Sequence, residues 1–454
     1  MNDEIYDVVI IGAGQAGVPL ASSLAAAGQK IALAERKQLG GSCVNFGCTP
    51  TKAVLGSAKV AHQARRAHEF ALEIPQVKVD FPGVLERAKK ILQKSVDGLE
   101  TVFSENPRLL RGHAMLEGKE GEHFVVRVGQ ERLKAKKVVL NPGTRANIPH
   151  IEGIEDINLI TADNWLEHPE LPRHLLMLGG GYIGLEMAQF YRRMGAEVTL
   201  VEHSGRLLER EDPEVSDGMR ALLEGEGVTL HLASKALKVE KTANGVLLLT
   251  LEGGTVLKGS HLFVAAGRKP NTFDMGLETV GLDGSKALEC GDTLETKVSG
   301  LYLSGDIRPG LQLTSTSYDD YRILENQFIG DGTRTTARLV PYGIWTDPEL
   351  ARVGLSETEA KKQGLEYNVA QIPAGRVARA VQEGNTQGFI KILVSPQTQE
   401  ILGATLLLAH AGELVHLLSS LMLLKAPYTV LRDAVLAHPT YTEGLQVALM
   451  TLEG

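Results

Sequence analysis

The sequence is poor in cysteine and in aromatic residues, and it has neither an excess of basic residues nor a long hydrophobic run. Three of its 454 residues are cysteine, and aromatic residues make up 5%. So few cysteines argue against a secreted fold held together by disulfides. No stretch approaches the roughly 20 apolar residues of a membrane-spanning helix, and no signal peptide precedes the first strand. We therefore expect a cytoplasmic protein with no membrane partner.

The charge and the length of the chain limit its partners and its organisation. The formal net charge is −8, and the pI is near 6.0. Binding to nucleic acid needs basic patches, so we expect no nucleic-acid partner. The length allows two to four domains of ~100–200 residues each. Glycine is abundant, with 49 residues, and these residues cluster in motifs.

Two of the three cysteines, Cys43 and Cys48, lie in the segment 40–52, which reads GGSCVNFGCTPTK. A zinc site would need a second pair of ligands, and the sequence has no other cluster of cysteine and histidine. We therefore expect no metal site here. The alternatives are a redox-active disulfide and two unreactive buried thiols.

The spacing of the two cysteines sets a geometric condition. On a regular helix, Cα atoms five residues apart are about 8–9 Å from each other, whereas a disulfide needs them within about 7 Å. A bond between Cys43 and Cys48 therefore requires a distorted start of a helix. Gly47 permits unusual backbone angles, Pro50 suits a first helical turn, and a helix N-terminus lowers the pKa of a thiol. We favour an activated, reducible disulfide.

The N-terminal segment has the pattern of a dinucleotide-binding βαβ unit. A buried-strand pattern at 7–11 is followed by a glycine-rich turn, a helix to Ala27 and a second strand at 31–34. The glycines let the backbone approach a pyrophosphate, and a carboxylate after the second strand suits a ribose hydroxyl. The residues that we assign to this site are Gly12, Gly14, Gln15, Ala16, Gly17 and Glu35.

A second unit of the same kind follows 167 positions later. A buried-strand pattern at 175–178 precedes a glycine-rich turn, a helix to about Met194 and a strand at 198–201. The motif residues are repeated as Gly179, Gly181, Gly184 and Glu202. This internal repeat predicts two dinucleotide sites in one chain.

Two dinucleotides beside a redox-active cysteine pair imply electron transfer. One would be a nicotinamide hydride donor, and the other a flavin that passes electron pairs to thiols. Glu202 suits a free ribose 2′-OH and repels a 2′-phosphate, which favours NADH. Arg206 and Arg210 follow closely, so NADPH stays open as an alternative.

The segments between the motifs give weaker signals. We expect a charged helical region at 53–109, broken at Pro75 and Pro82, and then short strands at 112–139. The turn at 141–144 either contacts a cofactor or is a plain surface turn. A strand at 301–303 precedes Asp306, whose simplest role is a cap of the next element. We expect Cys290 to be a structural thiol.

The chain changes character beyond about residue 335, where short strands surround helices and no dinucleotide motif occurs. Near its end stands His438-Pro439-Thr440-Tyr441-Thr442-Glu443. We expect Pro439 at the first helical position, His438 at the cap and Glu443 about one turn into the helix. A carboxylate that orients a histidine is typical of a general base, and the alternative is a capping histidine beside a solvated glutamate.

Together these motifs resemble those of the FAD-dependent pyridine nucleotide–disulfide oxidoreductases along nearly the whole chain. Segment 40–52 resembles the redox-disulfide motif of that family, 301–306 its second FAD motif, 265–271 its interdomain motif, and 341–357 with 438–443 its dimerisation domain. The resemblance implies an α/β fold with two Rossmann-like domains and a C-terminal α+β dimerisation domain. It divides the chain into an FAD-binding domain (1–150 and 268–334), an NAD(P)H-binding domain (151–267) and a dimerisation domain (335–454).

The resemblance also implies roles for single residues. Cys43 would attack the substrate, and Cys48 would face the flavin as a thiolate. Lys52 would pair with Glu186 near the flavin, and Tyr182 would cover the nicotinamide pocket. Further contacts to FAD or NAD would come from Gly41, Ser42, Lys52, Ala114, Gly143, Gly267, Asp306, Leu313 and Thr314. His438 and Glu443 would serve the disulfide of the other subunit, so the resemblance implies a homodimer.

The segments 210–213 and 318–322 are most similar to the mercuric-reductase-like branch, which also contains a copper reductase linked to reactive-chlorine resistance. Typical mercuric reductases carry a C-terminal cysteine pair, and this chain has none there. We expect an oxidoreductase that passes electrons from NADH through FAD and the Cys43–Cys48 disulfide to a small disulfide or a soft metal ion. The alternatives are a dihydrolipoamide dehydrogenase and, in another class, a non-catalytic redox sensor or complex subunit.

Overall fold

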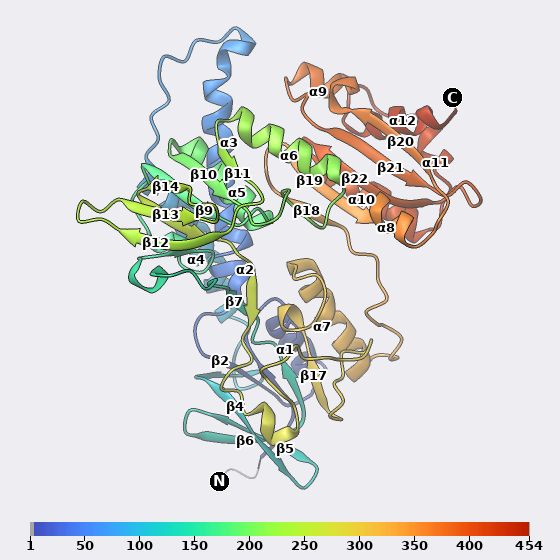
Figure 1. Ribbon diagram of the computed structural model, residues 1–454. Helices are drawn as coiled ribbons and strands as arrows, with labels where there is room; N and C mark the ends of the chain where they lie inside the picture. The colour runs from blue at the N-terminus through green and yellow to red at the C-terminus, as the bar shows by residue number, and fades with distance from the viewer. Residues whose placement is uncertain (1–3, 454) are drawn as a thin grey trace.

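The computed structural model describes residues 4–453, which form three sheets with their covering helices and two smaller β ribbons (Figure 1). The first sheet has seven strands. Six of them follow the order β3-β2-β1-β6-β5-β4, and the seventh, β17, pairs with the C-terminal end of β6. Strands β1, β2, β3, β6 and β17 run parallel, and β4 and β5 form an antiparallel extension. The strands are β1 (Ile5–Ile11), β2 (Ile31–Glu35), β3 (Arg108–Arg111), β4 (Ala114–Glu120), β5 (His123–Val128), β6 (Glu131–Leu140) and β17 (Leu301–Leu303).

Strand β1 is buried on both faces, as its continuous apolar sequence predicts. Val8 and Ile10 pack with residues of α1 (Gly17–Ala26) and α7 (Thr314–Ile329). Val9 and Ile11 face the opposite layer, which contains Phe124 of β5. The sheet therefore places the C-terminal end of β1, and the glycine turn after it, between two covered faces.

The second unit has a parallel sheet in the order β11-β10-β9-β15-β8 and a three-stranded antiparallel ribbon. Helix α5 (Tyr182–Met194) follows β9, and α6 (Pro213–Gly225) follows β10. The strands of the sheet are β8 (Ile160–Thr161), β9 (His174–Leu178), β10 (Glu197–Val201), β11 (Thr229–His231) and β15 (His261–Val264). The ribbon consists of β12 (Ala236–Lys241), β13 (Leu247–Leu251) and β14 (Val256–Gly259), and a separate ribbon pairs β7 (Thr144–Ala146) with β16 (Arg268–Pro270).

The third unit is an antiparallel sheet in the order β18-β19-β22-β21-β20 with helices around it, at the upper right of Figure 1. It has a core of its own, and Ile344, Leu350, Phe389 and Leu407 pack into the core of the second unit. The strands are β18 (Tyr342–Ile344), β19 (Glu349–Gly354), β20 (Asn368–Pro373), β21 (Phe389–Val394) and β22 (Ile401–Leu408). The helices are α8 (Glu357–Lys362), α9 (Ala378–Gln382), α10 (Ala411–Leu423), α11 (Thr429–Arg432) and α12 (Thr442–Met450).

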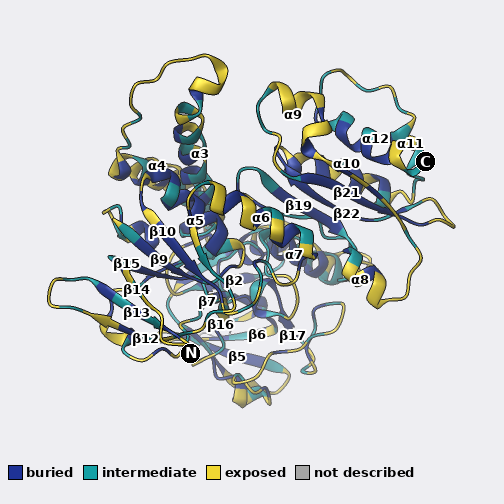
Figure 2. Cartoon of the chain, turned by 45° about the horizontal axis from the view of Figure 1, so that its top comes forward, coloured by how far each residue is buried: buried dark blue, intermediate teal, exposed yellow. Residues whose placement is uncertain are grey.

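Three helices near the N-terminus join the first two units. They are α2 (Gly41–Asn45), α3 (Cys48–Arg65) and α4 (Phe81–Glu100). Phe81 of α4 packs against Phe190 and Tyr191 of α5, with ring centroids 5.9 and 6.0 Å apart. These three rings are buried, whereas residues 68–76, which follow α3, are exposed (Figure 2). The contact anchors the cysteine segment to the second unit.

The prediction for residues 53–109 was wrong in two places. Leu109 lies in β3, a parallel edge strand. All four residues of β3 pair with β2, and this pairing outweighs the charged helical pattern of the surrounding sequence. Pro82 does not break a helix, since it lies in the first turn of α4, where its missing N–H costs nothing. The side chain of Asp80 caps this helix by accepting the N–H of Gly83 at 3.0 Å.

The predicted helix start at Pro439 was also wrong. Helix α12 begins at Thr442. Thr440 and Glu443 bond reciprocally there, since the Thr440 N–H donates to Glu443 Oε2 at 2.7 Å and the Glu443 N–H donates to Thr440 Oγ1 at 3.3 Å. This is a capping box, and the Thr-x-x-Glu spacing in the sequence was the signal for it.

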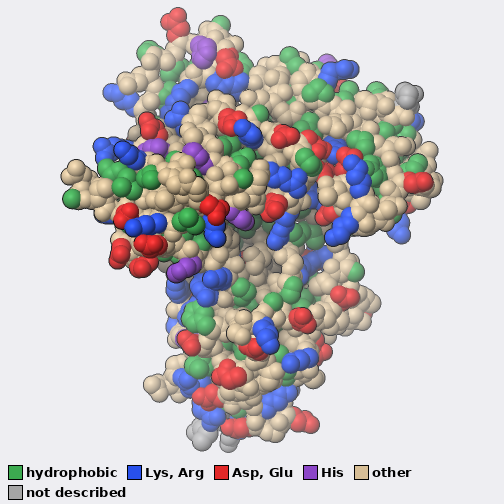
Figure 3. Space-filling view, viewed as in Figure 1, with side chains coloured by type: hydrophobic (Ala, Val, Ile, Leu, Met, Phe, Trp, Pro, Cys, Tyr) green, Lys and Arg blue, Asp and Glu red, His purple; other side chains and the backbone are tan. Residues whose placement is uncertain are grey.

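Charged side chains of both signs are interspersed on the face in Figure 3. Among residues 4–453, no helix is long and apolar enough to cross a membrane. Several buried ion pairs join the second and third units, among them Lys391 with Asp212, Arg352 with Glu211 and a cluster around Arg193. There Arg193, whose side chain is 4% exposed, bonds Glu226 at 2.7 Å and Asp347 at 2.8 Å.

Replacing Arg193 with alanine should destabilise the protein strongly, because two partly buried carboxylates lose their cation. The cost of breaking such a pair is about 3–5 kcal/mol. The matched control is Arg220→Ala, which removes an exposed pair with Glu224 on α6 and should cost at most about 1 kcal/mol. Urea denaturation midpoints measure both, and equal midpoints for the two variants would contradict the assigned role of Arg193.

Candidate functional site

The two glycine turns of the repeat have the same geometry. Gly12 and Gly179 have φ values of 108° and 111°, which only glycine adopts readily. A Cβ on Gly17 would lie 2.1 Å from the carbonyl oxygen of Gly12, and one on Gly184 would lie 2.0 Å from that of Gly179. These contacts explain why both turns need glycine at both positions.

The two acidic residues of the repeat are held by equivalent bonds. Glu35 accepts the N–H of Ala13 at 2.9 Å and that of Lys37 at 2.7 Å. Glu202 accepts the N–H of Gly180 at 2.5 Å and that of Ser204 at 2.8 Å. Each carboxylate therefore lies beside its glycine turn, where the ribose of a dinucleotide would lie.

A cavity of about 1180 Å³ extends from Glu35 to the cysteine pair and on to α10. Most of the predicted site residues line it. They are Gly12, Gly14, Gln15, Glu35, Gly41, Ser42, Cys43, Cys48, Lys52, Ala114, Gly143, Tyr182, Glu186, Asp306, Leu313 and Thr314. The turn at 141–144 lies in its wall, and Asn141 Nδ2 donates to the carbonyl of Gly12 at 3.1 Å. The turn therefore faces the proposed cofactor site.

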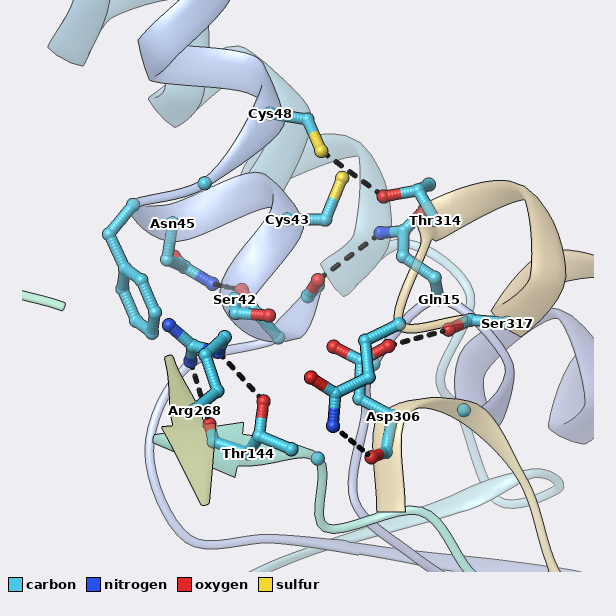
Figure 4. Close-up of a pocket in the computed structure, with 18 of the residues that line it drawn as sticks. Gln15, Ser42, Cys43, Asn45, Cys48, Thr144, Arg268, Asp306, Thr314 and Ser317 are labelled. Atoms are coloured by element: carbon cyan, nitrogen blue, oxygen red, sulfur yellow. Dashed lines mark hydrogen bonds between the residues drawn. The ribbon is translucent and has the colours of Figure 1, made fainter. Parts of the chain in front are cut away.

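The cysteine segment has the distorted geometry that the spacing required. Helix α2 ends at Asn45, and Cys48 is the first residue of α3. A Cβ on Gly47 would lie 2.8 Å from the carbonyl oxygen of Ser42, so this close approach depends on glycine. The sulfur atoms of Cys43 and Cys48 point toward each other without a disulfide bond (Figure 4).

The two thiols have different acidities. The hydrogen bond from Cys43, and then the positive charge of Lys52, lower the pKa of Cys48 to about 6, although burial opposes this shift. The pKa of Cys43 lies well above its usual value, because of its hydrogen bond to Cys48 and its burial. These shifts favour the proton on Cys43 and the negative charge on Cys48.

Lys52 and Glu186 form an ion pair at the centre of the cavity wall. Lys52 Nζ lies 2.8 and 3.0 Å from the two carboxylate oxygens, and Glu186 is 3% exposed. Glu186 also accepts the N–H of Trp345 at 2.8 Å. Residues from α3, from α5 and from the chain after β18 thus meet at one carboxylate.

Other predicted residues lie around this centre. Asp306 is half-buried, and its pKa is raised mainly by burial. Among the side chains of residues 4–453, Ser317 alone bonds the Asp306 carboxylate, through its hydroxyl at 3.4 Å, so the carboxylate oxygens are free to accept from hydroxyl groups in the cavity. Tyr182 is 40% exposed, and partial burial of its ring, with the nearby Asp306, raises its pKa to about 12.

The remaining predicted residues lie outside the cavity wall. These are Ala16, Gly17, Gly179, Gly181, Gly184, Glu202, Gly267, His438 and Glu443. His438 Nδ1 lies 2.9 Å from Glu443 Oε1, and the histidine side chain is 70% exposed. The predicted His–Glu pair therefore exists, but within one chain it does not reach the cysteines.

Sequence analysis did not identify several residues that line the cavity. Trp165 donates its indole N–H to the carbonyl of Phe46 at 2.8 Å, which satisfies the backbone at the break between α2 and α3. Trp345, Val415 and His416 come from the third unit. No local motif marks these residues, since only the packing of the units brings them to the cavity.

The cavity fits FAD on the chemistry of its walls. The glycine turn and Glu35 suit the adenosine diphosphate part, and the free acceptors of Asp306 suit a polyol chain. The cysteine pair and Lys52–Glu186 lie in the same cavity, where a redox-active ring would reach the sulfur of Cys48.

Comparison with protein families gives two matches that together span most of the chain. Residues 6–320 match the model described as pyridine nucleotide-disulphide oxidoreductase. Residues 340–449 match the model described as the dimerisation domain of the same oxidoreductases.

Three curated proteins illustrate the similarity. The probable pyridine nucleotide-disulfide oxidoreductase RclA of Escherichia coli K12 is 31% identical over 97% of this chain and 98% of its own. A dihydrolipoyl dehydrogenase of Cupriavidus necator is 32% identical over 99% and 98%, and a mercuric reductase of Lysinibacillus sphaericus is 28% identical over 100% and 84%. A solved structure of RclA, described as the Cu(II) complex of an HOCl-induced flavoprotein disulfide reductase, has a TM-score of 0.89 at 29% identity and covers 99% of this chain and 100% of its own.

Replacing Lys52 with methionine should raise the pKa of Cys48 from about 6, because a positive charge one helical turn away favours the thiolate. We expect a rise of about one pH unit. The measurement is the rate of iodoacetamide alkylation of Cys48 in the reduced protein against pH, followed by mass spectrometry. Lys52→Arg keeps the charge and should keep the midpoint, and an unchanged midpoint in Lys52→Met would refute this electrostatic role.

Proposed function

The chain belongs to the pyridine nucleotide-disulphide oxidoreductases, and we propose that it passes electrons from NADH to a soft metal ion or a small disulfide. Its family uses FAD and NAD(P)H, and the chain is an NAD(P)H-dependent flavoprotein disulfide oxidoreductase. The single observation that carries the proposal is the pair of facing sulfurs, Cys43 and Cys48, beside Lys52–Glu186 in one cavity.

When bound, FAD supplies the two-electron chemistry that links a hydride donor to thiols. The residues that would hold it are Glu35 and the turn at 12–17 for the adenosine diphosphate and Asp306 for the ribityl chain. Lys52, fixed by Glu186, would lie against the ring. Tyr182 would cover the position of the nicotinamide until NADH enters.

The cysteine pair would then carry the electrons. The disulfide accepts the two electrons and the proton of one hydride, which breaks the S–S bond and leaves a thiol on Cys43 and a thiolate on Cys48. This product has the protonation state that the structure favours, since Cys48 has the lowered pKa and Cys43 the raised one. The residues around the pair are therefore arranged to stabilise the negative charge of the Cys48 thiolate that this step produces.

Transfer to the acceptor needs Cys43 without its proton. With a disulfide acceptor, the Cys43 thiolate attacks one sulfur and expels a thiolate, and Cys48 then attacks Cys43 and releases the second thiol. With a soft metal ion, both sulfurs bind the ion and transfer two electrons to it, or one electron to each of two Cu(II) ions. Both routes re-form the Cys43–Cys48 disulfide.

A histidine from a second subunit would take the proton of Cys43. The match to a dimerisation domain supports a homodimer. The third unit carries exposed apolar side chains that suit such a contact, among them Leu423, Leu424 and Val435. We propose that His438 of the partner subunit, oriented by its bond to a glutamate equivalent to Glu443, acts as the base at Cys43.

The relatives favour a metal ion as the acceptor. RclA has been crystallised with Cu(II), and a mercuric reductase matches the whole chain. Copper and mercury are both soft enough to bind a dithiol. This chain has one cysteine outside the pair, the half-buried Cys290, so it has no second thiol pair to deliver Hg(II). We therefore favour Cu(II) over Hg(II) as the electron acceptor.

A dihydrolipoamide dehydrogenase is the second candidate. The His438–Glu443 bond of 2.9 Å suits proton transfer to and from a dithiol substrate as well as it suits the first candidate, so the sequence identity is what favours the second. The identity to a dihydrolipoyl dehydrogenase, 32%, is as high as that to RclA, 31%.

Anaerobic rates of NADH oxidation should separate the candidates. With Cu(II), Hg(II), lipoamide and glutathione disulfide as acceptors, we expect the fastest turnover with Cu(II). Cys43→Ser should lose at least about a hundredfold in rate with every acceptor, yet retain FAD and its reduction by NADH. Fast turnover with lipoamide and none with metals would select the second candidate, and full activity in Cys43→Ser would refute both.

Glu202 should determine the choice of nucleotide. Its carboxylate is fixed beside the second glycine turn, where it accepts a ribose hydroxyl and repels a phosphate. We expect Glu202→Ala to lower kcat/KM for NADH about tenfold or more. The difference between the kcat/KM values for NADH and for NADPH should therefore become smaller. Glu209→Ala, which removes an exposed acid nearby, is the control. A wild-type enzyme that uses NADPH as well as NADH would contradict this assignment.

A further inference from the structure

The sulfur of Cys48 has a neighbour outside the cysteine segment. Thr314 Oγ1 lies 3.2 Å from Cys48 Sγ, and the two side chains face each other in the cavity (Figure 4). The Thr314 hydroxyl also acts on Cys43 through a hydrogen bond that lowers the pKa of that thiol, although the pKa of Cys43 stays raised overall because of Cys48 and of burial. A hydroxyl beside a sulfur that carries negative charge donates its hydrogen to it.

The same contact joins the N-termini of two long helices. Cys48 is the first residue of α3, which has 18 residues, and Thr314 is the first residue of α7, which has 16. Both helices carry a partial positive charge at this end. By contrast, Cys43 lies inside α2, which has five residues. The surroundings of the two sulfurs therefore differ, and they favour negative charge on Cys48.

We propose that Thr314 is a positioning residue that holds Cys48 as the thiolate and thereby leaves the proton on Cys43. The inference rests on the proposed electron transfer through the cysteine pair. It adds a function to a residue that otherwise only borders the flavin. The hydroxyl acts through Cys48, because its hydrogen bond stabilises the ionised sulfur and not the protonated one.

Several other groups face Cys48 and act on its charge. Lys52 lies one turn further along α3 and favours the thiolate, whereas Glu186 opposes it. Tyr182 lies at the start of α5, and its pKa is raised in part by the charge of Cys48. Cys43 donates to Cys48. A test of Thr314 must therefore keep Lys52, Glu186 and Tyr182 unchanged and treat Cys43 separately.

The test uses the FAD-loaded enzyme with Cys43→Ser, which leaves one thiol in the pair. A thiolate on Cys48 next to oxidised flavin gives a long-wavelength charge-transfer absorption, and its growth with pH reports the ionisation of Cys48. Thr314→Val and Thr314→Ala, added to this background, should raise the midpoint by about one pH unit. Thr314→Ser keeps the hydroxyl and should stay within about 0.3 units of the parent.

Two outcomes would overturn the inference in different ways. Midpoints for Thr314→Val and Thr314→Ala that equal the parent would refute the role of Thr314 and leave the proposed function intact. No charge-transfer absorption in the parent at any pH from about 5 to 10 would refute the proposed approach of Cys48 to the flavin, and the role of Thr314 with it. Flavin absorbance per protein shows that each variant is folded and loaded.

Discussion

The close approach at Gly47 is the constraint on which the candidate site depends. It ends α2 and lets α3 begin at Cys48, so that two sulfurs five residues apart can meet. A continuous helix would hold them too far apart for a bond. The break exposes a carbonyl at Phe46, and Trp165 from the second unit satisfies it. The redox pair is therefore held by a contact between units as much as by its own segment.

The same dependence on several units recurs around the pair. The carboxylate of Glu186 on α5 is bonded to Lys52 on α3 and to the backbone of Trp345 in the third unit. Thr314 reaches Cys48 from α7, at the other side of the cavity. The contacts of Glu186 fix a charge in a place that no single domain provides, whereas Thr314 belongs to the same proposed domain as Cys48, and the acidity of Cys48 depends on both.

The sequence predicted the parts of the site that have a local physical signature. Gly12 and Gly17 were identified because a pyrophosphate turn needs glycine at those positions, and the structure shows the close contacts that require it. The repeat predicted that Glu202 would match Glu35, and both carboxylates are held by equivalent backbone bonds. The family resemblance was confirmed by the comparisons. The roles of the individual site residues and the domain limits stay predictions.

The chain by itself determined the two nucleotide-binding turns, the cysteine pair and the kind of fold, because glycine, acidic and cysteine residues at set spacings act within one strand–helix unit. It did not determine β3, where pairing with β2 outweighed the local pattern, whereas the start of α12 was misplaced although the Thr440–Glu443 capping box has a local signal in the sequence. Only the tertiary structure decided which distant groups surround Cys48, which residues of the third unit line the cavity, and that His438 lies away from the cysteines of its own chain. The surroundings of Cys48 include contacts between residues more than 100 positions apart, such as Cys48 with Thr314 and Lys52 with Glu186, and such contacts leave no periodic trace in the sequence.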